Sequence, residues 1–525
     1  MQPSACARTT TARRLAAGAA VVVLAVTAAA CGGSPDSPAG RGPTTTRAES
    51  ALHSAAALDW KRCEPAPSQE AQGAGSLTWE CATLPVPLDH ARPDGEKIGI
   101  ALIRTRAADP AHRIGSLVFN FGGPGGSGVE TLPGTAHLFE TLRTRYDLVS
   151  FDPRGVGASD GVRCLDDKQL DAYFAADNTP DDRSEERSYV RGVKDFNRAC
   201  EKNAGTVLPY VGTEDAARDM DLMRAALGDG KLHYFGISYG TELGGVYAHL
   251  FPERVGRAVL DSAIDPTLDA THRSLAQAKG FQLALESYTE DCAAQGEVCP
   301  LGEDPREGAQ KVAALIRRLD GEPFPGIGDR RLTQALATSG IAQALYSADF
   351  WPILSEALEE ANTDDGRLLM VLGDALNGRD DKGRYSTLQS SFTAISCKDS
   401  SERPTPDEVR ALLPEFRAAS PAFGEFMAWS LLSCTDWAVQ GTAKTPDVSA
   451  KGAAPIVVVG TTNDPATPFK GTERMVRALG PGVGYQLTHE GEGHGAYTGG
   501  SSCVRESVDA YLFDGTLPEK GATCR

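Results

Sequence analysis

Near-continuous apolar runs alternate with amphipathic stretches in the first half of the chain. The runs are SLVFNF at 116–121, YDLVSFD at 146–152, KLHYFGI at 231–237 and RAVLDSA at 257–263. Apolar runs of this kind are typical of strands that are buried on both faces of a parallel sheet. Between them, GTEDAARDMDLMRAALG at 212–228 predicts a helix, N-capped by Thr213 and ended by Gly228. This alternation predicts an α/β fold.

The pattern changes near residue 267. Residues 267–450 lack strand-like runs and contain amphipathic helical stretches such as GIAQALYSADFWPILSEALEEA. The earlier pattern then resumes with PIVVVGTTND and GYQLTHEGEGH. We therefore expect a sheet domain made of residues 58–266 and 451–525, interrupted by a helical lid at 267–450.

The first 30 residues resemble a secretory signal. Three arginines, the last of them Arg14, precede the apolar run LAAGAAVVVLAVTAAA, which stops just before Cys31. A cysteine directly after AAA resembles a bacterial lipoprotein cleavage site, at which Cys31 would carry the lipid. Simple secretion with cleavage nearby is the alternative. Residues 31–57, rich in Ser, Pro, Thr and Ala, are expected to form a flexible tether.

The apolar run is too short and too rich in alanine to predict a membrane span. We therefore expect contact with the membrane only through the N-terminal lipid. The mature protein would then lie at the outer face of the cell membrane, or be secreted or held in the cell wall.

The overall charge narrows the range of partners. The 525 residues carry a net charge of −18 at pH 7, with 41% apolar and 23% charged residues, which is an ordinary globular composition. Phosphate backbones repel a chain this acidic, so no nucleic-acid partner is expected.

The cysteines agree with export. Ten of the 12 lie outside the signal region, and an even number in an oxidising compartment should form disulfide bonds. The sequence cannot fix their connectivity, but neighbours along the chain form plausible pairs, namely Cys63 with Cys81, Cys164 with Cys200, Cys292 with Cys299, Cys397 with Cys434, and Cys503 with Cys524. No CxxC motif occurs and the spacings are irregular, so no zinc site is expected.

The pentapeptide GISYG at 236–240 has the form G-x-S-x-G. It follows a strand-like run and precedes a helix-like one, which is the context of a nucleophile elbow. Gly236 and Gly240 allow a turn too sharp for side chains, and this turn would present the Ser238 hydroxyl above the edge of the sheet. A chance turn with a surface serine is the alternative reading.

A serine hydroxyl needs a base to attack, and the base needs an acid to orient it. Asp464 follows the strand-like PIVVVGTTN, and His494 lies in a glycine-rich loop after the next strand, so Ser238, the acid and the histidine occur in that order. A turn aspartate and a surface histidine are the separate alternatives. His489 is the rival base. Thr467 either bonds to Asp464 or caps a helix.

The segment NFGGPGGSG at 120–128 is the expected oxyanion loop. It follows a strand, and its glycines leave backbone N–H groups open to a ligand. We expect one donor from Gly123, with Gly122 as the alternative, and a second from Tyr239, the residue after the nucleophile. The segment lacks the Gly-Lys-Ser/Thr ending of a phosphate loop.

Together, GGPGGSG, FDPRGVGASD, GISYGTELGGVYAHLFPERVGRAVLD, ALYSADFWP, NDPATP and GEGHG resemble the secreted tripeptidyl aminopeptidases. These belong with the proline iminopeptidase-type enzymes of the α/β-hydrolase superfamily. The match covers nearly all of the chain after the tether. Iminopeptidases carry a histidine before the glycines, where this chain has Phe121. Asp152 and Arg154 are expected to support the site rather than to react.

The resemblance implies an exported serine peptidase that releases short peptides from the N-terminus of its substrates. Ser238, Asp464 and His494 would form the triad, and no metal or organic cofactor is expected. A carboxylesterase or lipase with the same triad is one alternative, and a non-catalytic binding lipoprotein is another. Cleavage near a free N-terminus also requires carboxylates that bind the ammonium group, and the lid offers several, among them Glu356, Glu359, Glu360, Asp399 and Asp436.

Overall fold

The computed structural model describes residues 58–65 and 77–525. The predicted signal at 1–30, the lipidation site Cys31 and the tether at 31–57 lie outside these residues. Within the described ranges, no helix combines the length and the apolar character that crossing a bilayer requires.

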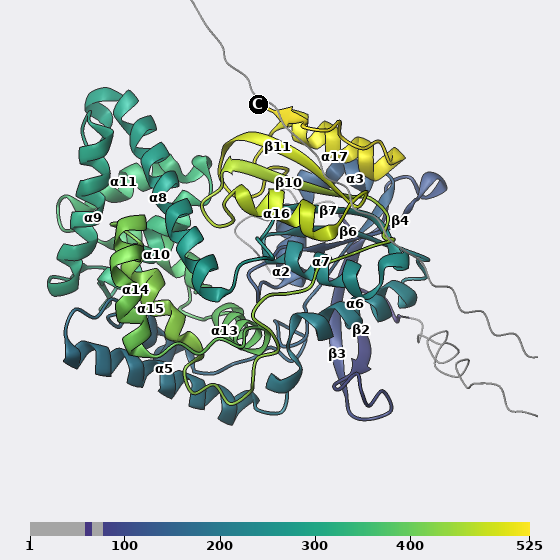
Figure 1. Ribbon diagram of the computed structural model, residues 1–525, viewed down its shortest axis with the longest axis horizontal. Coiled ribbons are helices and arrows are strands. Elements are labelled where there is room, and N and C mark those ends of the chain that lie inside the picture. Colours follow the sequence, from purple (N-terminus) through teal and green to yellow (C-terminus); the bar gives the residue numbers. More distant parts are fainter. Residues whose placement is uncertain (1–57, 66–76) are drawn as a thin grey trace, which may run out of the picture. The chain divides into compact units, whose positions relative to one another are not determined.

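Ten strands of the described chain form one sheet with helices on both faces (Figure 1). Their order is β1-β2-β3-β5-β4-β6-β7-β10-β11-β12. β3 pairs antiparallel with β2 and β5, and every pair from β5 to β12 is parallel. The strands are β1 (Lys61–Cys63), β2 (Trp79–Pro87), β3 (Lys97–Thr105), β4 (Gly115–Asn120), β5 (Tyr146–Phe151), β6 (Leu232–Ile237), β7 (Val255–Asp261), β10 (Ile456–Asn463), β11 (Gly484–Glu492) and β12 (Thr523–Cys524).

Both faces of the parallel strands are buried, as the apolar runs predicted. In β10, Val457 and Val459 pack into the core on one face of the sheet, while Val458 packs into the core on the other. All six residues of β4 are buried. Alternate side chains of a strand point to opposite faces, so burial on both faces requires apolar residues at successive positions. The predicted α/β fold is confirmed.

The helices that cover these two faces are α2 (Gly128–Thr135), α3 (Glu140–Arg143), α6 (Thr213–Ala226), α7 (Tyr239–Leu250), α16 (Lys470–Leu479) and α17 (Ser502–Asp514). Two further helices between β5 and β6 contact the helical insertion described next, namely α4 (Asp167–Ala175) and α5 (Arg183–Ala204).

A helical insertion separates β7 from β10 (Figure 1). Its core includes Phe281, Leu336, Leu354 and Trp429, all nearly inaccessible to solvent. A short antiparallel pair, β8 (Phe324–Pro325) and β9 (Arg331–Leu332), lies within it. Its helices are α8 (Ala270–Ala294), α9 (Pro305–Gly321), α10 (Gln334–Leu345), α11 (Trp351–Ala361), α12 (Arg367–Asn377), α13 (Leu388–Asp399), α14 (Pro406–Ala419) and α15 (Gly424–Ser430).

Helix α5 also packs on the insertion, although it precedes β6 in the chain. The Tyr189 hydroxyl donates to the Trp429 carbonyl oxygen at 3.0 Å, and Val190 packs on the same core. The helical layer is therefore built from two separate segments of the chain.

Five disulfide bonds join the same cysteine pairs that the order along the chain suggested. They are Cys63–Cys81, Cys164–Cys200, Cys292–Cys299, Cys397–Cys434 and Cys503–Cys524. Each closes a loop of between 7 and 37 residues, so each fastens segments that are near neighbours along the chain.

The predicted N-cap role of Thr213 is wrong. Helix α6 begins at Thr213 itself, and its N-cap is Gly212, which has no side chain to accept a hydrogen bond. The Thr213 N–H instead donates to Asp399 Oδ1 at 2.8 Å, so the insertion supplies the cap. A capping rule considers only neighbouring residues, so it cannot predict a partner that lies 186 residues away.

Candidate active site

Ser238 lies in a sharp turn between β6 and α7, with φ 58° and ψ −124°. A Cβ on Gly236 would lie 2.3 Å from the Gly240 carbonyl oxygen, and one on Gly240 would lie 2.5 Å from the Asn120 carbonyl oxygen. Only glycine fits at both positions, and the strained serine between them is held in place by this packing. Ser238 stays partly exposed at the N-terminus of α7, where the helix dipole favours negative charge.

Asp464 and His494 form a hydrogen-bonded pair at the same edge of the sheet. Asp464 follows β10, His494 follows β11, and His494 Nδ1 lies 2.9 Å from each carboxylate oxygen of Asp464. The carboxylate also accepts the backbone N–H groups of Ala466 and Thr467 and the Thr467 hydroxyl, each at 2.9 Å. These bonds fix the carboxylate so that it can orient the imidazole.

The charge state of His494 depends on its two acidic neighbours. Burial of the ring opposes its protonation, but the charge and hydrogen bond of Asp464 and the charge of Asp261 outweigh burial, so the pKa of His494 is raised. The Tyr346 ring of the insertion packs edge-on at 5.4 Å, and the His494 N–H donates to the Tyr346 carbonyl oxygen at 2.8 Å. The insertion therefore reaches the histidine loop directly.

Asp261, the last residue of β7, joins the serine turn to the histidine loop. Its carbonyl oxygen accepts the Ser238 N–H at 3.0 Å, and its carboxylate accepts the N–H groups of Ala496 and Tyr497 at 3.1 and 2.9 Å. Across the described part of the chain, no direct hydrogen bond joins Ser238 to His494. This contact is often long in unliganded enzymes and shortens when substrate binds.

Asp261 was not among the residues predicted from the sequence. The available signal was an aspartate at the end of an otherwise apolar strand, in the run RAVLDSA. Burial raises the pKa of Asp261 to about 6, although the backbone hydrogen bonds from Tyr497 and Ala496 lower it. The side chain is completely buried, so Asp261 holds the loop and does not reach a substrate.

The glycine-rich loop lies against the serine turn. A Cβ on Gly122 would lie 2.8 Å from Ser238 Cβ and 3.2 Å from the Tyr239 nitrogen. The Gly122 N–H donates to Asn120 Oδ1 at 3.1 Å, so it is already occupied. Among the described residues, the Gly123 N–H has no hydrogen-bond acceptor, and Tyr239 is the first residue of α7, where N–H groups lack helical partners. This geometry favours Gly123 and Tyr239 over Gly122 as donors.

Comparison with known proteins agrees with this geometry. A family profile described as TAP-like protein matches residues 420–524. The curated relatives span much more of the chain. Serine protease Hip1 of Mycobacterium tuberculosis is 38% identical over 485 residues, which cover 89% of this chain and 91% of Hip1. The chain belongs to the tripeptidyl aminopeptidase-like family.

Two further members of the family carry different activity names. Carboxylesterase B of Mycobacterium tuberculosis is 36% identical over 461 residues, covering 85% of this chain and 86% of that protein. Tripeptidyl aminopeptidase of Streptomyces lividans is 29% identical over 487 residues, covering 89% and 87%. The family is one of serine hydrolases with the α/β-hydrolase fold, and this chain is a serine hydrolase.

Residues of the family's D-x-R-G-x-G-x-S stretch are buried and fully bonded. Asp152 accepts the Ser127 hydroxyl at 2.7 Å and the Ala158 N–H at 2.8 Å. Arg154 is 0% exposed, and its Nε lies 2.6 Å from Asp219. These contacts fit the supporting role expected for Asp152 and Arg154.

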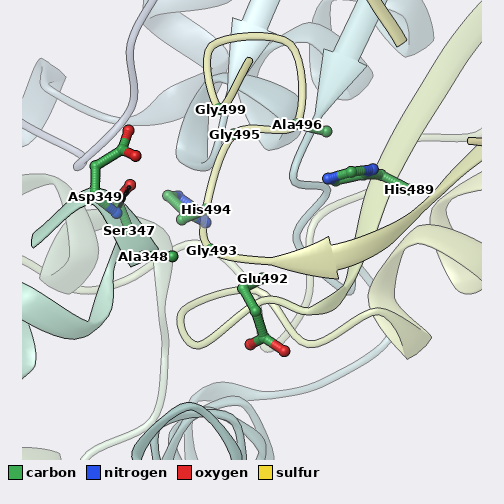
Figure 2. Close-up of a pocket in the computed structure, with 10 residues that line it drawn as sticks. All are labelled: Ser347, Ala348, Asp349, His489, Glu492, Gly493, His494, Gly495, Ala496 and Gly499. Carbon is green, nitrogen blue, oxygen red and sulfur yellow. Dashed lines mark hydrogen bonds between the residues drawn. The ribbon is translucent and has the colours of Figure 1, made fainter. Parts of the chain in front are cut away.

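His489 and His494 lie on different sides of a small cavity of about 50 Å³ (Figure 2). Burial lowers the pKa of His489, and its Nδ1 is buried without a partner. Within residues 58–65 and 77–525, no hydrogen bond joins His489 to Asp464, so His494 alone is oriented by that carboxylate. Asp349 of the insertion and Glu492 of β11 also line the cavity.

The five acidic residues considered for amine binding differ in their partners and in their exposure to solvent. Asp399 accepts two hydrogen bonds from Thr213, and Asp436 pairs with Lys194 at 2.9 Å. Of these five residues, Glu356 and Glu359 of α11 are exposed, as is the ion-paired Asp436. Asp349, which lies in the motif ALYSADFWP but was not among these candidates, lines the same cavity as His494.

Proposed function

We propose that this protein is an exported serine peptidase that releases short peptides, as a tripeptidyl aminopeptidase does, from the N-terminus of its substrates. Ser238 is the nucleophile, His494 the general base and Asp464 the orienting acid. The observation that carries this proposal is the pairing of His494 Nδ1 with both Asp464 oxygens at 2.9 Å, next to the strained serine turn.

The reaction follows from these roles. His494 Nε2 takes the Ser238 proton as the oxygen attacks the substrate carbonyl carbon, and Asp464 stabilises the imidazolium that forms. The amide bond breaks when the imidazolium gives its proton to the leaving amine. Water, activated by the same histidine, then attacks the acyl-enzyme and releases the carboxylic acid. No step requires a group from outside the chain except water.

The developing negative charge needs two fixed donors. The backbone N–H groups of Gly123 and Tyr239 fill this role in the proposal, because both lie beside Ser238 and neither is used elsewhere in the described structure. Such a donor contributes about a hundred- to thousandfold to turnover.

Carboxylates beside the base support a preference for substrates with a free N-terminal ammonium group. Asp349 and Glu492 line the cavity next to His494, and Glu492 Oε2 is buried without a hydrogen-bond partner. Figure 2 places their carboxylates on different sides of the histidine. An ammonium group entering this region would meet negative charge, whereas a blocked N-terminus would leave these carboxylates without a counter-charge.

Kinetics on matched substrates test the peptidase assignment. A tripeptide p-nitroanilide with a free N-terminus should be cleaved with a kcat/KM at least about tenfold above its N-acetylated form, because a hydrogen bond to a charged group contributes about 1.5–3 kcal/mol and about 1.4 kcal/mol corresponds to a factor of ten. Equal rates on the two peptides would contradict N-terminal recognition.

Carboxylesterase is the second candidate, favoured by the relative that carries that name at 36% identity. The same triad cleaves esters, and esters have a better leaving group. An enzyme that hydrolyses short p-nitrophenyl esters but neither peptide would support this assignment instead.

Export is supported by the five disulfide bonds, because such bonds persist in oxidising compartments. We propose that Cys31 carries the lipid anchor after removal of residues 1–30. Metabolic labelling of bacteria with radioactive palmitate should label the wild-type protein and not the Cys31→Ser variant. A wild-type protein without label would contradict the lipid anchor.

A further inference from the structure

A buried chain of hydrogen bonds joins the residue after the nucleophile to the helical insertion. The Tyr239 hydroxyl lies 2.6 Å from Thr213 Oγ1, which lies 2.6 Å from Asp399 Oδ2. The Thr213 N–H also donates to Asp399 Oδ1 at 2.8 Å. Thr213 and Tyr239 are each only 4% exposed. Three elements, α6, α7 and α13, therefore meet in one polar contact beside the serine turn.

When Asp399 is ionised, the hydrogen bonds of this chain can run in only one direction. A carboxylate only accepts, so both donors of Thr213 point to Asp399. Thr213 Oγ1 is then left as the acceptor for the Tyr239 O–H. If residue 399 donates to Thr213 instead, Thr213 can turn its own proton towards Tyr239, and the buried phenol loses its acceptor.

Helix α13 also packs on the other half of the proposed oxyanion hole. A Cβ on Gly125, next to the cis Gly123–Pro124 bond, would lie 2.6 Å from the Leu388 carbonyl oxygen and 2.8 Å from the Phe392 nitrogen. The start of α13 thus packs on the glycine-rich loop, while its last residue, Asp399, holds Tyr239 through Thr213. Helix α13 therefore contacts both the loop that carries the Gly123 N–H and the hydrogen-bond chain that holds Tyr239.

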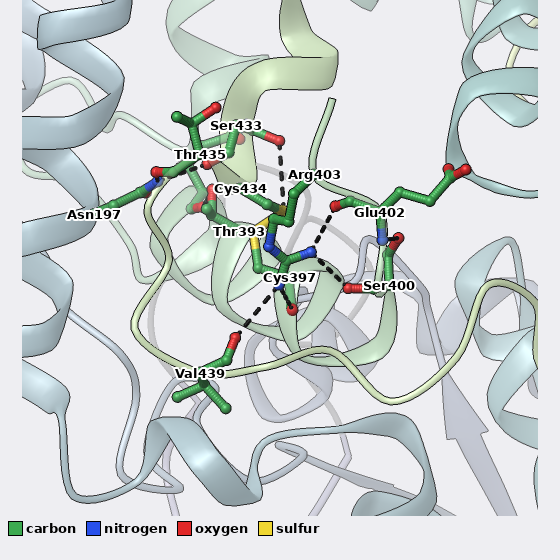
Figure 3. The surroundings of a disulfide bond; sticks show 11 residues. Asn197, Thr393, Cys397, Ser400, Glu402, Arg403, Ser433, Cys434, Thr435 and Val439 are labelled. Carbon is green, nitrogen blue, oxygen red and sulfur yellow. Dashed lines mark hydrogen bonds between the residues drawn. A yellow bond between two sulfur atoms is a disulfide. The ribbon is translucent and has the colours of Figure 1, made fainter. Parts of the chain in front are cut away.

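The end of α13 is firmly anchored. Cys397 is disulfide-bonded to Cys434. The Arg403 guanidinium beside this bond donates to the carbonyl oxygens of Cys397 and Val439 through one nitrogen and to those of Ser400 and Glu402 through another (Figure 3). Asp399 therefore has a fixed position from which to hold Thr213.

We propose that Asp399 is a positioning residue for the oxyanion hole, which fixes the Tyr239 backbone N–H by holding the Tyr239 side chain through Thr213. This inference rests on the proposed serine-hydrolase mechanism at Ser238. The hydroxyl of Tyr239 touches no reacting atom. The hydroxyl instead fixes the orientation of Tyr239 at the start of α7. The Tyr239 backbone N–H then already points at the oxyanion and need not reorganise during the reaction.

Burial and a neighbouring acidic residue disfavour the ionised form of Asp399. Burial raises the pKa of Asp399 to about 7, and the charge of Glu242 in α7 also raises it, while the Thr213 hydrogen bonds and Lys398 lower it. Glu242 is itself paired with Arg273 of α8 at 2.9 Å. Because the folded-state pKa is raised, the contribution of Asp399 to the free energy of unfolding falls as the pH rises from about 4 to about 7. A side chain that ionises at this cost is better explained by function than by stability.

The test compares Asp399→Asn and Tyr239→Phe with wild type on p-nitrophenyl acetate, a substrate that does not depend on peptide specificity. Asparagine keeps the shape but donates to Thr213 Oγ1, and phenylalanine removes the hydroxyl. Each variant should lower kcat about tenfold at pH 8.5 with KM within about twofold, which is less than the loss of a donor itself. The double variant should be no slower than the slower single variant, because both changes break one chain.

Tyr288→Phe is the matched control. Tyr288 is a buried tyrosine of α8 whose hydroxyl lies 2.9 Å from Ser355 Oγ, far along the chain from the site. Its loss should lower the melting temperature about as much as Tyr239→Phe does, with kcat unchanged. A similar fall in kcat for the control would show that the losses reflect general destabilisation and would overturn the proposal.

The pH dependence separates positioning from a purely structural role. The ratio of wild-type kcat to Asp399→Asn kcat should fall from about ten at pH 8.5 towards one below pH 6, because wild-type Asp399 is then neutral like asparagine. A ratio that stays constant, or unchanged kcat in Tyr239→Phe, would overturn the positioning role while leaving the serine-hydrolase assignment intact. A folded wild-type enzyme that neither turns over the ester nor reacts with a fluorophosphonate would overturn both.

Discussion

At the scale of single residues, the site depends on polar groups whose positions are set by their neighbours. Asp464 accepts two backbone N–H groups and one hydroxyl in addition to His494, so its carboxylate cannot rotate away from the imidazole. Asp261 performs the corresponding task for the loop that carries His494. Catalysis by a serine therefore relies on aspartates that never touch the substrate.

Replacing Asp464 with asparagine should lower kcat by about 10⁴-fold, because the amide would stabilise the wrong tautomer of His494. The isosteric side chain can still accept from Ala466 and Thr467, so the melting temperature should change little. The measurement is kcat on p-nitrophenyl acetate together with thermal unfolding of each variant. A loss of less than tenfold in a folded protein would mean that Asp464 is not the orienting acid.

The positions that follow strands were predictable, and the contacts between distant segments were not. Ser238 and Asp464 each follow an apolar run, and His494 lies in a glycine-rich loop after the next predicted strand, so the order of strands and motifs was enough to select them. Thr213 and Asp399 are 186 residues apart, and their contact depends on how the insertion packs. Neighbouring residues alone therefore predict a local cap at Thr213 and do not distinguish Asp399 from the other acidic residues of the insertion.

At the scale of elements, two of the disulfide bonds lie within the helical insertion and crosslink it internally. The bond between Cys397 and Cys434 spans 37 residues and anchors the end of α13, whereas the bond between Cys292 and Cys299 spans only 7. A crosslink that closes a longer loop removes more conformational entropy from the unfolded chain. The two bonds should therefore differ in their contribution to stability.

Alanine replacement of both Cys397 and Cys434 should lower the free energy of unfolding by about 3.8 kcal/mol, against about 2.4 kcal/mol for the pair Cys292 and Cys299. Urea unfolding of the two double variants and the wild type measures the difference directly. Replacement of the first pair should also lower kcat, because it frees the end of α13 that holds Asp399. An equal or reversed order of stability would show that loop entropy does not govern these bonds.

At the scale of the whole molecule, the sheet brings together residues from β4, β6, β7, β10 and β11 because these strands run parallel and end at one edge. The insertion closes over that edge through Tyr346 and α13. The charge balance at the edge then sets the pH range of activity. His494 must be neutral to accept the serine proton, and its pKa is raised.

Activity should therefore fall as the pH is lowered through a value above 6.5, the ordinary pKa of histidine. The pH profile of kcat is best measured in the Asp399→Asn background, so that the titration of Asp399 does not contribute to the acid limb. Protonation of His494 does not weaken the fold: its raised pKa contributes stability below the unfolded-state value, and this is lost as the pH rises through the folded-state pKa. An acid limb centred below pH 6 would contradict the raised pKa.

The most direct measurement is the site of covalent modification by a fluorophosphonate, which reacts only with an activated serine. Mass spectrometry of the digested wild-type protein should find a single adduct, located on Ser238, and none on the folded Ser238→Ala variant. Labelling of His494→Ala should be slower by about a thousandfold or more. An adduct on a different serine, or no adduct on the folded wild-type protein, would contradict the central claim that Ser238 is the nucleophile.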